Sequence, residues 1–227
     1  MSKLLRVEKI TKAFNKKVVL SNVSFDLDNN EILVLVGENG TGKSTFLSIL
    51  VTLLKPDLGH IFLEGDDIVT NANLIKGKVA YVPQEIAIYP NLTVKDNMYF
   101  WASINGFSGV KCHDRVRALI DEFKLSEYEK QKAGKLSVGL RRRLSIATSM
   151  FLDAKLVIMD EPTAGLDIEA KNEIIKLVKT LKKQGRSIIY VTHIQDEIEA
   201  LAGKILRIKD GVSEYYDNVA EYYVAIK

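Results

Sequence analysis

The sequence contains a single cysteine, almost no net charge and no long apolar segment. Because Cys112 has no second cysteine to pair with, no disulfide can form within the chain, and a reducing cytoplasm is the expected environment. We expect no secretory leader, since the first residues do not combine basic, apolar and small-residue stretches. The longest apolar run, residues 46–54, includes Ser48 and Thr52 and falls far short of the roughly 20 residues that cross a bilayer.

Charge and composition narrow the class of protein further. The 32 lysines and arginines exceed the 29 acidic residues by only three, and they are scattered along the chain. A dedicated nucleic-acid-binding protein carries a concentrated basic surface, so we expect no nucleic acid as a partner. With 227 residues, of which 47% are hydrophobic, the chain is long enough for one sizeable globular domain with a smaller inserted subdomain.

The spacing of apolar residues predicts an α/β fold. Residues 4–14 and the alternating Val23, Phe25 and Leu27 are typical of two antiparallel strands joined by the polar turn 15–17. A third such strand is expected at residues 60–64. Four later runs are aliphatic without alternation, which favours strands buried on both faces; they are residues 32–36, 78–82, 156–159 and 187–192.

Helical and hairpin patterns lie between and after these runs. Apolar residues recur every three or four positions within residues 116–123 and 170–181, which predicts amphipathic helices. Residues 204–208 and 212–216 flank a Lys-Asp-Gly turn and predict a hairpin. Strands that alternate with helices indicate a mostly parallel central sheet, with the antiparallel N-terminal strands beside it.

A phosphate-binding loop follows the strand at residues 32–36. The segment GENGTGKST, residues 37–45, matches the pattern G-x-x-x-x-G-K-[ST] in its strand-loop-helix setting. Its glycines let backbone N–H groups surround a polyphosphate, and the helix that begins near Lys43 adds its positive dipole end. The pattern predicts that Lys43 reaches the β- and γ-phosphates and that the Ser44 hydroxyl binds Mg²⁺.

Two carboxylates end the strand at residues 156–159. Asp160 and Glu161 fall at its carboxyl end, where open α/β sheets bind ligands. We expect Asp160 to hold Mg²⁺ through its coordination shell and Glu161 to direct a water at the γ-phosphate as general base. A phosphate loop with acidic partners still leaves kinases, GTPases, helicases and transport ATPases open.

Further motifs narrow that choice. Gln84 follows the strand 78–82, LSVGLRRRL occupies residues 136–144, AGLD residues 164–167, and His193 follows the strand 187–192. With these motifs in this order, the sequence resembles the ATP-binding-cassette (ABC) ATPases over essentially its whole length. The resemblance identifies residues 37–45 as Walker A, Gln84 as the Q-loop, residues 136–144 as the signature, residues 156–161 as Walker B, residues 164–167 as the D-loop and His193 as the switch histidine.

The resemblance implies a P-loop NTPase fold in one ABC ATPase domain, residues 1–227. Residues 1–84 and 136–227 would form the RecA-like core with its antiparallel β-subdomain, and residues 85–135 an inserted helical subdomain. ATP and Mg²⁺ are the implied ligands. The implied nucleotide contacts are Phe14, Gly37, Glu38, Asn39, Gly40, Thr41, Gly42, Lys43, Ser44, Thr45 and Asp167, with Ser137 and Gly139 acting on the ATP of a second chain. Catalysis is implied for Glu161, His193, Gln84 and Lys43, and the Mg²⁺ site for Ser44, Gln84 and Asp160.

Three local interpretations follow. Phe14 either stacks on adenine or ends its strand as a core residue. Val138 and Leu140 replace the first Gly and the Gln of the commonest family signature, LSGGQ. A β-branched Val138 does not easily take a positive φ. A heteromeric pair of subunits with one weakened ATP site is therefore an alternative to a pair with two equal sites. The run Arg141-Arg142-Arg143 is interpreted as a solvated helix face, with Arg141 as a candidate for holding the signature loop.

The resemblance also implies partners. These are transmembrane permease subunits and a second ABC ATPase subunit, identical or different, which would place the chain at the cytoplasmic face of the membrane. The aromatic residues of segment 85–135 either receive a helix of the permease or form the core of their subdomain. YVPQE with YPNLTVKDN resembles exporters of drugs, bacteriocins and polysaccharides. The alternative is a non-transport ABC ATPase that acts on ribosomes or DNA.

Overall fold

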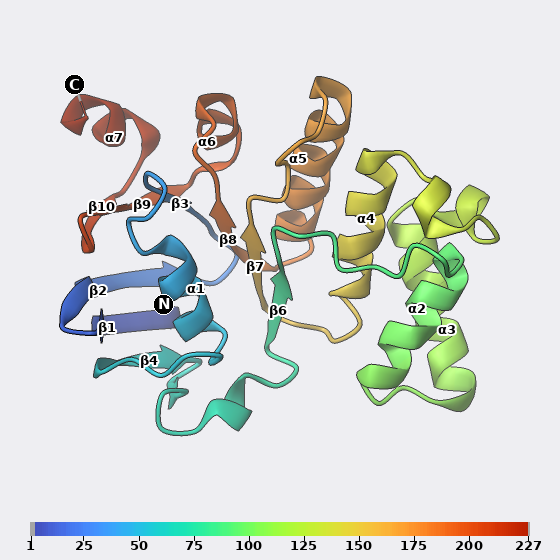
Figure 1. Cartoon of the computed structure of the whole chain (residues 1–227), viewed down its shortest axis with the longest axis horizontal. Coiled ribbons are helices and arrows are strands. Elements are labelled where there is room, and N and C mark those ends of the chain that lie inside the picture. Colours follow the sequence, from blue (N-terminus) through green and yellow to red (C-terminus); the bar gives the residue numbers. More distant parts are fainter. Residues whose placement is uncertain (1–2, 227) are drawn as a thin grey trace.

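A six-stranded sheet forms the centre of the computed structural model, which describes residues 3–226. Its strand order is β10-β9-β3-β8-β7-β6, and all neighbours except β10 and β9 pair in parallel (Figure 1). The strands are β3 (Ile32–Val36), β6 (Val79–Val82), β7 (Leu156–Asp160), β8 (Ser187–Val191), β9 (Lys204–Lys209) and β10 (Val212–Tyr216). The parallel central sheet predicted from the aliphatic runs is confirmed.

Both faces of this sheet are buried, because neighbouring residues of each strand enter two different hydrophobic clusters. In β3, Val34 packs into one cluster while Leu33 and Leu35 pack into the other. Helix α1 (Lys43–Leu50) belongs to the second cluster. The first cluster includes residues of α4 (Val138–Thr148), α5 (Ile168–Lys183) and α6 (Gln195–Leu201). The missing polar alternation in the sequence follows from this two-sided burial.

The N-terminal strands form a separate antiparallel sheet that packs on α1. Its order is β2-β1-β4-β5, made of β1 (Lys3–Phe14), β2 (Lys17–Asp28), β4 (Leu58–Leu63) and β5 (Asp66–Asp67). Phe25 of β2 meets Phe46 of α1 edge-on, with ring centroids 5.8 Å apart. The turn between β1 and β2 places Asn15 and Lys16 at φ 47° and 67°, as two-residue hairpin turns require. The predicted antiparallel pair is confirmed.

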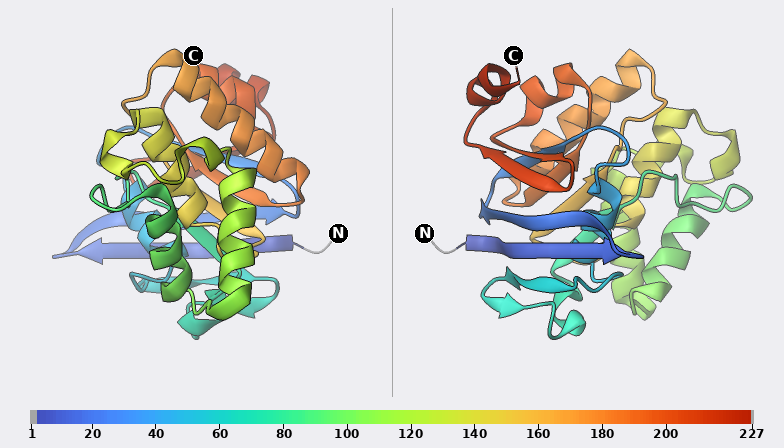
Figure 2. Two further views of the ribbon diagram at one scale, coloured as in Figure 1. Left: turned by 90° about the vertical axis from the view of Figure 1, so that its right-hand side faces the viewer. Right: turned by 60° about the vertical axis from the view of Figure 1, so that its left-hand side comes forward.

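Helices α2 (Val94–Ile104) and α3 (Gly109–Glu122) lie between β6 and α4 in the chain, at the end of the molecule away from the antiparallel sheet (Figures 1 and 2). Arg115 of α3 ties them to the core by donating to the carbonyls of Met150 and Phe151, at 2.6 and 3.0 Å. The boundaries of an inserted subdomain at 85–135 stay a prediction. Across residues 3–226, no helix is both long and apolar enough to cross a bilayer.

The C-terminal hairpin joins the two sheets, and helix α7 (Val219–Ala225) follows it. Its turn lies beside strand β2, where Ser21 N donates to Gly211 O at 2.7 Å. Gly211 has φ +78°, and a Cβ at this position would lie 2.6 Å from Val19 O. Only glycine fits both the left-handed backbone and this close approach.

We therefore expect Gly211→Ala to lower the free energy of unfolding by about 2–4 kcal/mol, because it adds a backbone clash to a strained φ. Gly65→Ala is the matched control: Gly65 has φ +91°, but nothing lies within 4 Å of a Cβ there. Its loss should be about 1 kcal/mol. Urea unfolding of both variants measures the difference, and equal losses would contradict the packing role of Gly211.

Candidate nucleotide-binding site

A loop at residues 37–42 connects β3 to α1, so the N-terminus of this helix faces the space enclosed by the loop. Gly42 is the N-cap of α1 with φ 106°, and a Cβ there would lie 2.8 Å from Leu20 Cδ2 and 2.9 Å from Val19 O. A side chain at this position would push the loop away from β2. The glycine therefore allows the first amides of α1 to reach the loop, where the helix dipole favours an anion.

Lys43 is enclosed by this loop, with 8% of the residue exposed. Its Nζ donates to Gly37 O at 2.7 Å and Glu38 O at 2.8 Å, so the ammonium is held inside the turn. Burial lowers the pKa of Lys43, while the negative charges of Glu161 and Asp160 act in the opposite direction. The ammonium is thus a concentrated positive charge at the start of α1.

Two carboxylates stand opposite this ammonium at the end of β7. Burial raises the pKa of Asp160, and the neighbouring charge of Glu161 adds to the rise, with Lys43 opposing it. Glu161 has φ +42°, a left-handed backbone that is strained for a residue with a side chain. The two carboxylates together carry more negative charge than the Lys43 ammonium balances, and a site for a divalent cation needs such an excess.

Glu161 is also contacted by side chains from two other loops. Gln84, two residues beyond β6, donates from Nε2 to Glu161 Oε2 at 3.1 Å. His193, two residues beyond β8, places Nδ1 3.4 Å from Glu161 Oε1. One carboxylate is therefore flanked from both sides, an arrangement that can hold a general base in a fixed orientation.

These residues line one pocket of about 290 Å³. The lining consists of Val19, Asn39, Gly40, Gly42, Lys43, Ser44, Thr45, Gln84, Asp160, Glu161 and His193. Other expected site residues lie elsewhere. Phe14 is 44% exposed at the end of β1, so it is not the core residue of the alternative interpretation. Ser137, Gly139 and Asp167 are absent from the lining.

A family model described as ABC transporter matches residues 20–164, a stretch that includes the loop, Gln84, the 136–144 segment and both carboxylates. The chain belongs to the ABC transporter family. Membership confirms the ABC-type ATPase expected from the motifs, and with it the ATP-binding subunit of an ABC transporter.

Relatives of this ABC chain are named for both export and import. Linearmycin resistance ATP-binding protein LnrL of Bacillus subtilis (strain 168) is 36% identical over 92% of this chain and 67% of LnrL. Nod factor export ATP-binding protein I of Paraburkholderia xenovorans (strain LB400) is 32% identical over 91% of this chain and 68% of that protein. Ribose import ATP-binding protein RbsA of Bacillus subtilis (strain 168) is 34% identical over 96% of this chain, but over only 45% of RbsA. The chain thus spans about two thirds of the first two relatives and less than half of the third.

Solved ABC structures share the fold. A structure described as the ATP-binding subunit of an ABC transporter superposes with a TM-score of 0.83 at 26% identity, covering 98% of this chain and 93% of that one. A nucleotide-free ATP-binding cassette from an ABC transporter gives a TM-score of 0.88 at 24% identity, over 99% and 95% of the two chains. The predicted α/β ABC fold is confirmed by these likenesses.

The ABC signature segment begins α4 without backbone strain. Ser137 is the N-cap, and its Oγ accepts from Leu140 N at 3.2 Å. Val138 starts the helix, is 41% exposed and has no positive φ, so the strain considered for this substitution does not arise. A Cβ on Gly139 would lie 2.7 Å from Cβ of Ala170 in α5. Asp167 caps that second helix by accepting from Ala170 N at 2.8 Å.

The interpretation of the arginine run as a solvated helix face is wrong for Arg142, which is only 2% exposed. Its guanidinium donates to the carbonyls of Pro83 and Gln84. The side chain of Arg143 is 15% exposed and pairs with Glu173 of α5. Arg141 is partly buried, and its Nε has no hydrogen-bond partner among the described residues. Helical spacing alone does not predict that α4 turns this part of its surface inward.

Glu197 is a residue that sequence reasoning missed. It is fully buried in α6 and accepts hydrogen bonds from Thr163 and Thr192 at 2.6 Å each and from Tyr190 at 3.1 Å. Burial, followed by the charge of Glu197, raises the pKa of Tyr190. Thr163 lies two residues after Glu161 and Thr192 precedes His193, so this carboxylate joins the segments that carry both. The sequence signal is weak, since Glu197 falls among other acidic helix residues.

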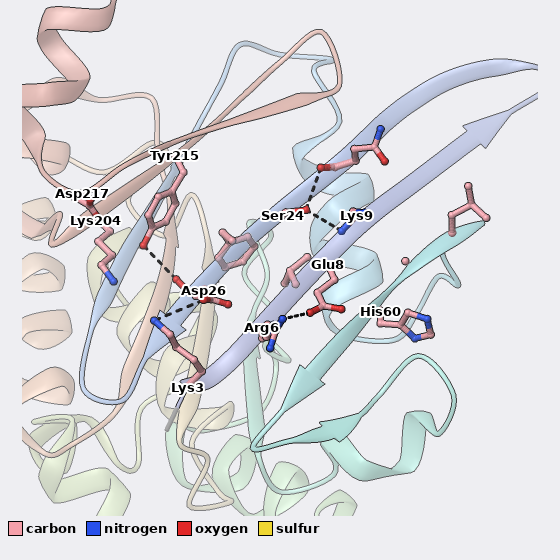
Figure 3. A pocket seen from close by; sticks show the side chains of 15 residues that line it. Lys3, Arg6, Glu8, Lys9, Ser24, Asp26, His60, Lys204, Tyr215 and Asp217 are labelled. Atoms are coloured by element: carbon pink, nitrogen blue, oxygen red, sulfur yellow. Dashed lines mark hydrogen bonds and ion pairs between the residues drawn. The ribbon is translucent and has the colours of Figure 1, made fainter. Parts of the chain in front are cut away.

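A larger hollow of about 910 Å³ lies elsewhere, between the antiparallel sheet and β10 (Figure 3). The close-up shows that several of its polar side chains are bonded to one another or to neighbouring backbone. Arg6 pairs with Glu8, Lys3 with Asp26, and Tyr215 Oη donates to Asp26 O. The smaller pocket is the better candidate for the nucleotide site, because it combines a phosphate loop with the two carboxylates at the end of β7.

We expect Asp160→Asn to raise the midpoint of thermal unfolding at neutral pH, because it removes a carboxylate whose ionised form is disfavoured in the folded chain. A raised folded-state pKa stabilises the wild type below the unfolded-state pKa, and this contribution is lost as pH rises through the folded-state value. The advantage of the variant should therefore shrink in acid. Calorimetry across pH measures it, with the exposed Asp114→Asn as control. A lower midpoint at neutral pH would contradict the expectation.

Proposed function

We propose that this chain binds ATP and Mg²⁺ at residues 37–45, hydrolyses ATP in a head-to-tail dimer with a second ABC ATPase subunit, and drives a separate transmembrane permease. One observation carries the proposal: the pocket gathers the phosphate loop, both carboxylates, Gln84 and His193, yet no residue of α4 lines it. The signature contribution would then come from another chain.

The capped end of α4 is suited to that role in trans. Its first turn presents Ser137 and the exposed Val138, and the helix dipole favours a γ-phosphate at this position. In the proposed dimer, each signature closes over the ATP held by the partner's phosphate loop. The exposed Phe14 would stack on the adenine, and Lys43 would exchange its backbone carbonyls for β- and γ-phosphate oxygens.

The residues fit Mg²⁺. The ion prefers octahedral oxygen coordination, keeps several waters and is held by one or two carboxylates together with phosphates. Ser44, Gln84 and Asp160 line the pocket together. Burial, followed by the charge of Glu161, raises the pKa of Asp160, so a cation bound beside it would stabilise its ionised form. When bound, Mg²⁺ supplies neutralisation of charge on the β- and γ-phosphates.

Glu161 would then act as general base. Gln84 and His193 fix its two oxygens, which leaves the carboxylate oriented to accept a proton from a water in line with the γ-phosphate. His193 and Lys43 would share the charge that builds on the transferred phosphoryl group. Asp167 and the buried Glu197 would keep the surrounding segments in place.

We expect Glu161→Gln to reduce ATP turnover by roughly 10²-fold or more, since the amide cannot take the proton. Because ATP would persist, the variant should accumulate as a dimer in the presence of MgATP. Phosphate release and light scattering measure the two effects, with the exposed Glu169→Gln as control. Turnover at the wild-type rate in Glu161→Gln would show that this residue is not the general base. If the variant binds ATP but stays monomeric, the proposed dimer is wrong.

The aromatic residues of segment 85–135 divide between the two interpretations given above. Tyr99, Trp101 and Phe107 pack against the main hydrophobic cluster, so they stabilise the fold. Tyr89 is 46% exposed and meets Phe100 edge-on, with ring centroids 4.5 Å apart. We place permease contact at this pair, because exposed aromatic residues are frequent anchors of protein interfaces.

Export is the proposed direction. The names of the resistance and Nod factor export relatives support it, as does the resemblance of residues 81–97 to exporters. Through its permease the chain would lie at the cytoplasmic face of the membrane.

We expect Tyr89→Ala to lower the membrane-bound fraction of the chain by about 10-fold, because a few anchors, often aromatic, carry much of an interface's affinity. Trp101→Ala should instead lower the midpoint of thermal unfolding. Fractionation of cells into membranes, ribosomes and supernatant measures the first effect. Sedimentation of the wild type with ribosomes, or an unchanged membrane fraction for Tyr89→Ala, would contradict the proposal.

A further inference from the structure

Arg142 lies in the second turn of α4 and is one of the most buried charged residues among those described, at 2% exposure. Burial lowers the pKa of its guanidinium, but arginine stays protonated in proteins. A buried positive charge is unfavourable unless specific acceptors compensate for it. The position of Arg142 therefore calls for an explanation in terms of what it binds.

Its partners are two consecutive carbonyls of the segment that leaves β6. Nη1 donates to Pro83 O at 3.0 Å, and Nη2 donates to Gln84 O. Two parallel N–H groups of a planar guanidinium match two neighbouring acceptors in a way that a lysine ammonium does not. The neighbouring Ser145, three residues further along α4, accepts from Ala87 N at 3.3 Å. Helix α4 thus grips residues 83–87 at two points on the same face.

Each end of this connection reaches a different part of the proposed ATPase. At one end, Gln84 contacts Glu161, in the pocket of this chain's own nucleotide. At the other end, Ser137 caps α4 between one and two turns before Arg142, at the surface proposed to close over the partner's nucleotide. Figure 1 shows the segment after β6 running past α4 toward α2.

We propose that Arg142 is a positioning residue that couples the two nucleotide sites of the dimer. This proposed coupling rests on the proposed function, since it needs the dimer described there. A shift of the Gln84 backbone when nucleotide binds is passed through the Arg142 guanidinium to α4, and so to the signature turn that serves the other site. The reverse also holds, because coupling between two sites is reciprocal.

The test compares amide hydrogen exchange in residues 136–144 with and without Mg²⁺ and the non-hydrolysable analogue AMP-PNP, at a dilution where the chain is monomeric. Coupling between sites is typically worth about 5- to 150-fold, so we expect the analogue to slow exchange in the wild type on the order of 10-fold. Arg142→Met should bind the analogue with similar affinity but lose this change. Fluorescence titration measures that affinity separately.

Arg143→Met is the matched control, because Arg143 pairs with Glu173 of α5 and makes no bond to residues 83–87. It should keep the nucleotide-dependent change. Arg142→Lys retains the buried charge and should keep part of the nucleotide-dependent change. This variant preserves the test if Arg142→Met unfolds. A purely structural role would raise exchange equally with and without the analogue.

Three outcomes would overturn the coupling. In the first two, Arg142→Met responds as the wild type does, or the wild type binds the analogue with no change in residues 136–144. In the third, Arg142→Lys and Arg143→Met lose the response equally. Failure of the wild type to bind the analogue at all would instead refute the proposed function, and the coupling with it. Titration and exchange thus separate the two.

Discussion

Parallel pairing of β3, β8, β7 and β6 brings loops from distant parts of the sequence to one edge of the central sheet. Since parallel strands all point the same way, their carboxyl ends must meet, and the chain can only leave the sheet there through its loops. The phosphate loop, Gln84, the Asp160–Glu161 pair and His193 each follow a different strand. Every contact in the candidate site depends on this single constraint.

The charges gathered at that edge are not balanced within the chain. Two carboxylates face the Lys43 ammonium, and the raised pKa of Asp160 together with the left-handed backbone of Glu161 shows that the folded state tolerates both at a cost. Such strain persists only where surrounding structure holds it in place. Here Gln84 and His193 restrain Glu161, and the buried Glu197 bonds to residues beside both segments. The proposed binding of a cation and a polyphosphate gives a reason for this cost, because both would compensate charges that the folded chain leaves unbalanced.

Sequence reasoning predicted the parts of this site that are local and missed those that are not. Strand runs ending in GENGTGKST or in Asp160-Glu161 specify their own surroundings, because the strand fixes where the next residues point. Arg142 and Glu197 gave no such signal, since a charge on a helix has the same spacing whether it faces water or the core. Their partners are distant in sequence: Arg142 binds carbonyls 58 and 59 residues away, and Glu197 binds Thr163 34 residues away. The orientation of α4 against residues 83–87 decides these contacts, and that is a property of tertiary packing.

The altered signature can be understood in the same terms. Gly139 is fixed by this chain, because any side chain there would meet Ala170, and Ser137 is fixed because it caps α4. Val138 is different: it is exposed, lies in ordinary helical backbone and makes no packing demand on its own subunit. Leu140 packs partly against the core. Replacing a glycine by valine at such an exposed helix start changes the outer surface while leaving the fold intact. In the proposed dimer, the consequence of Val138 therefore falls on the subunit that closes over α4 and not on the fold of this chain.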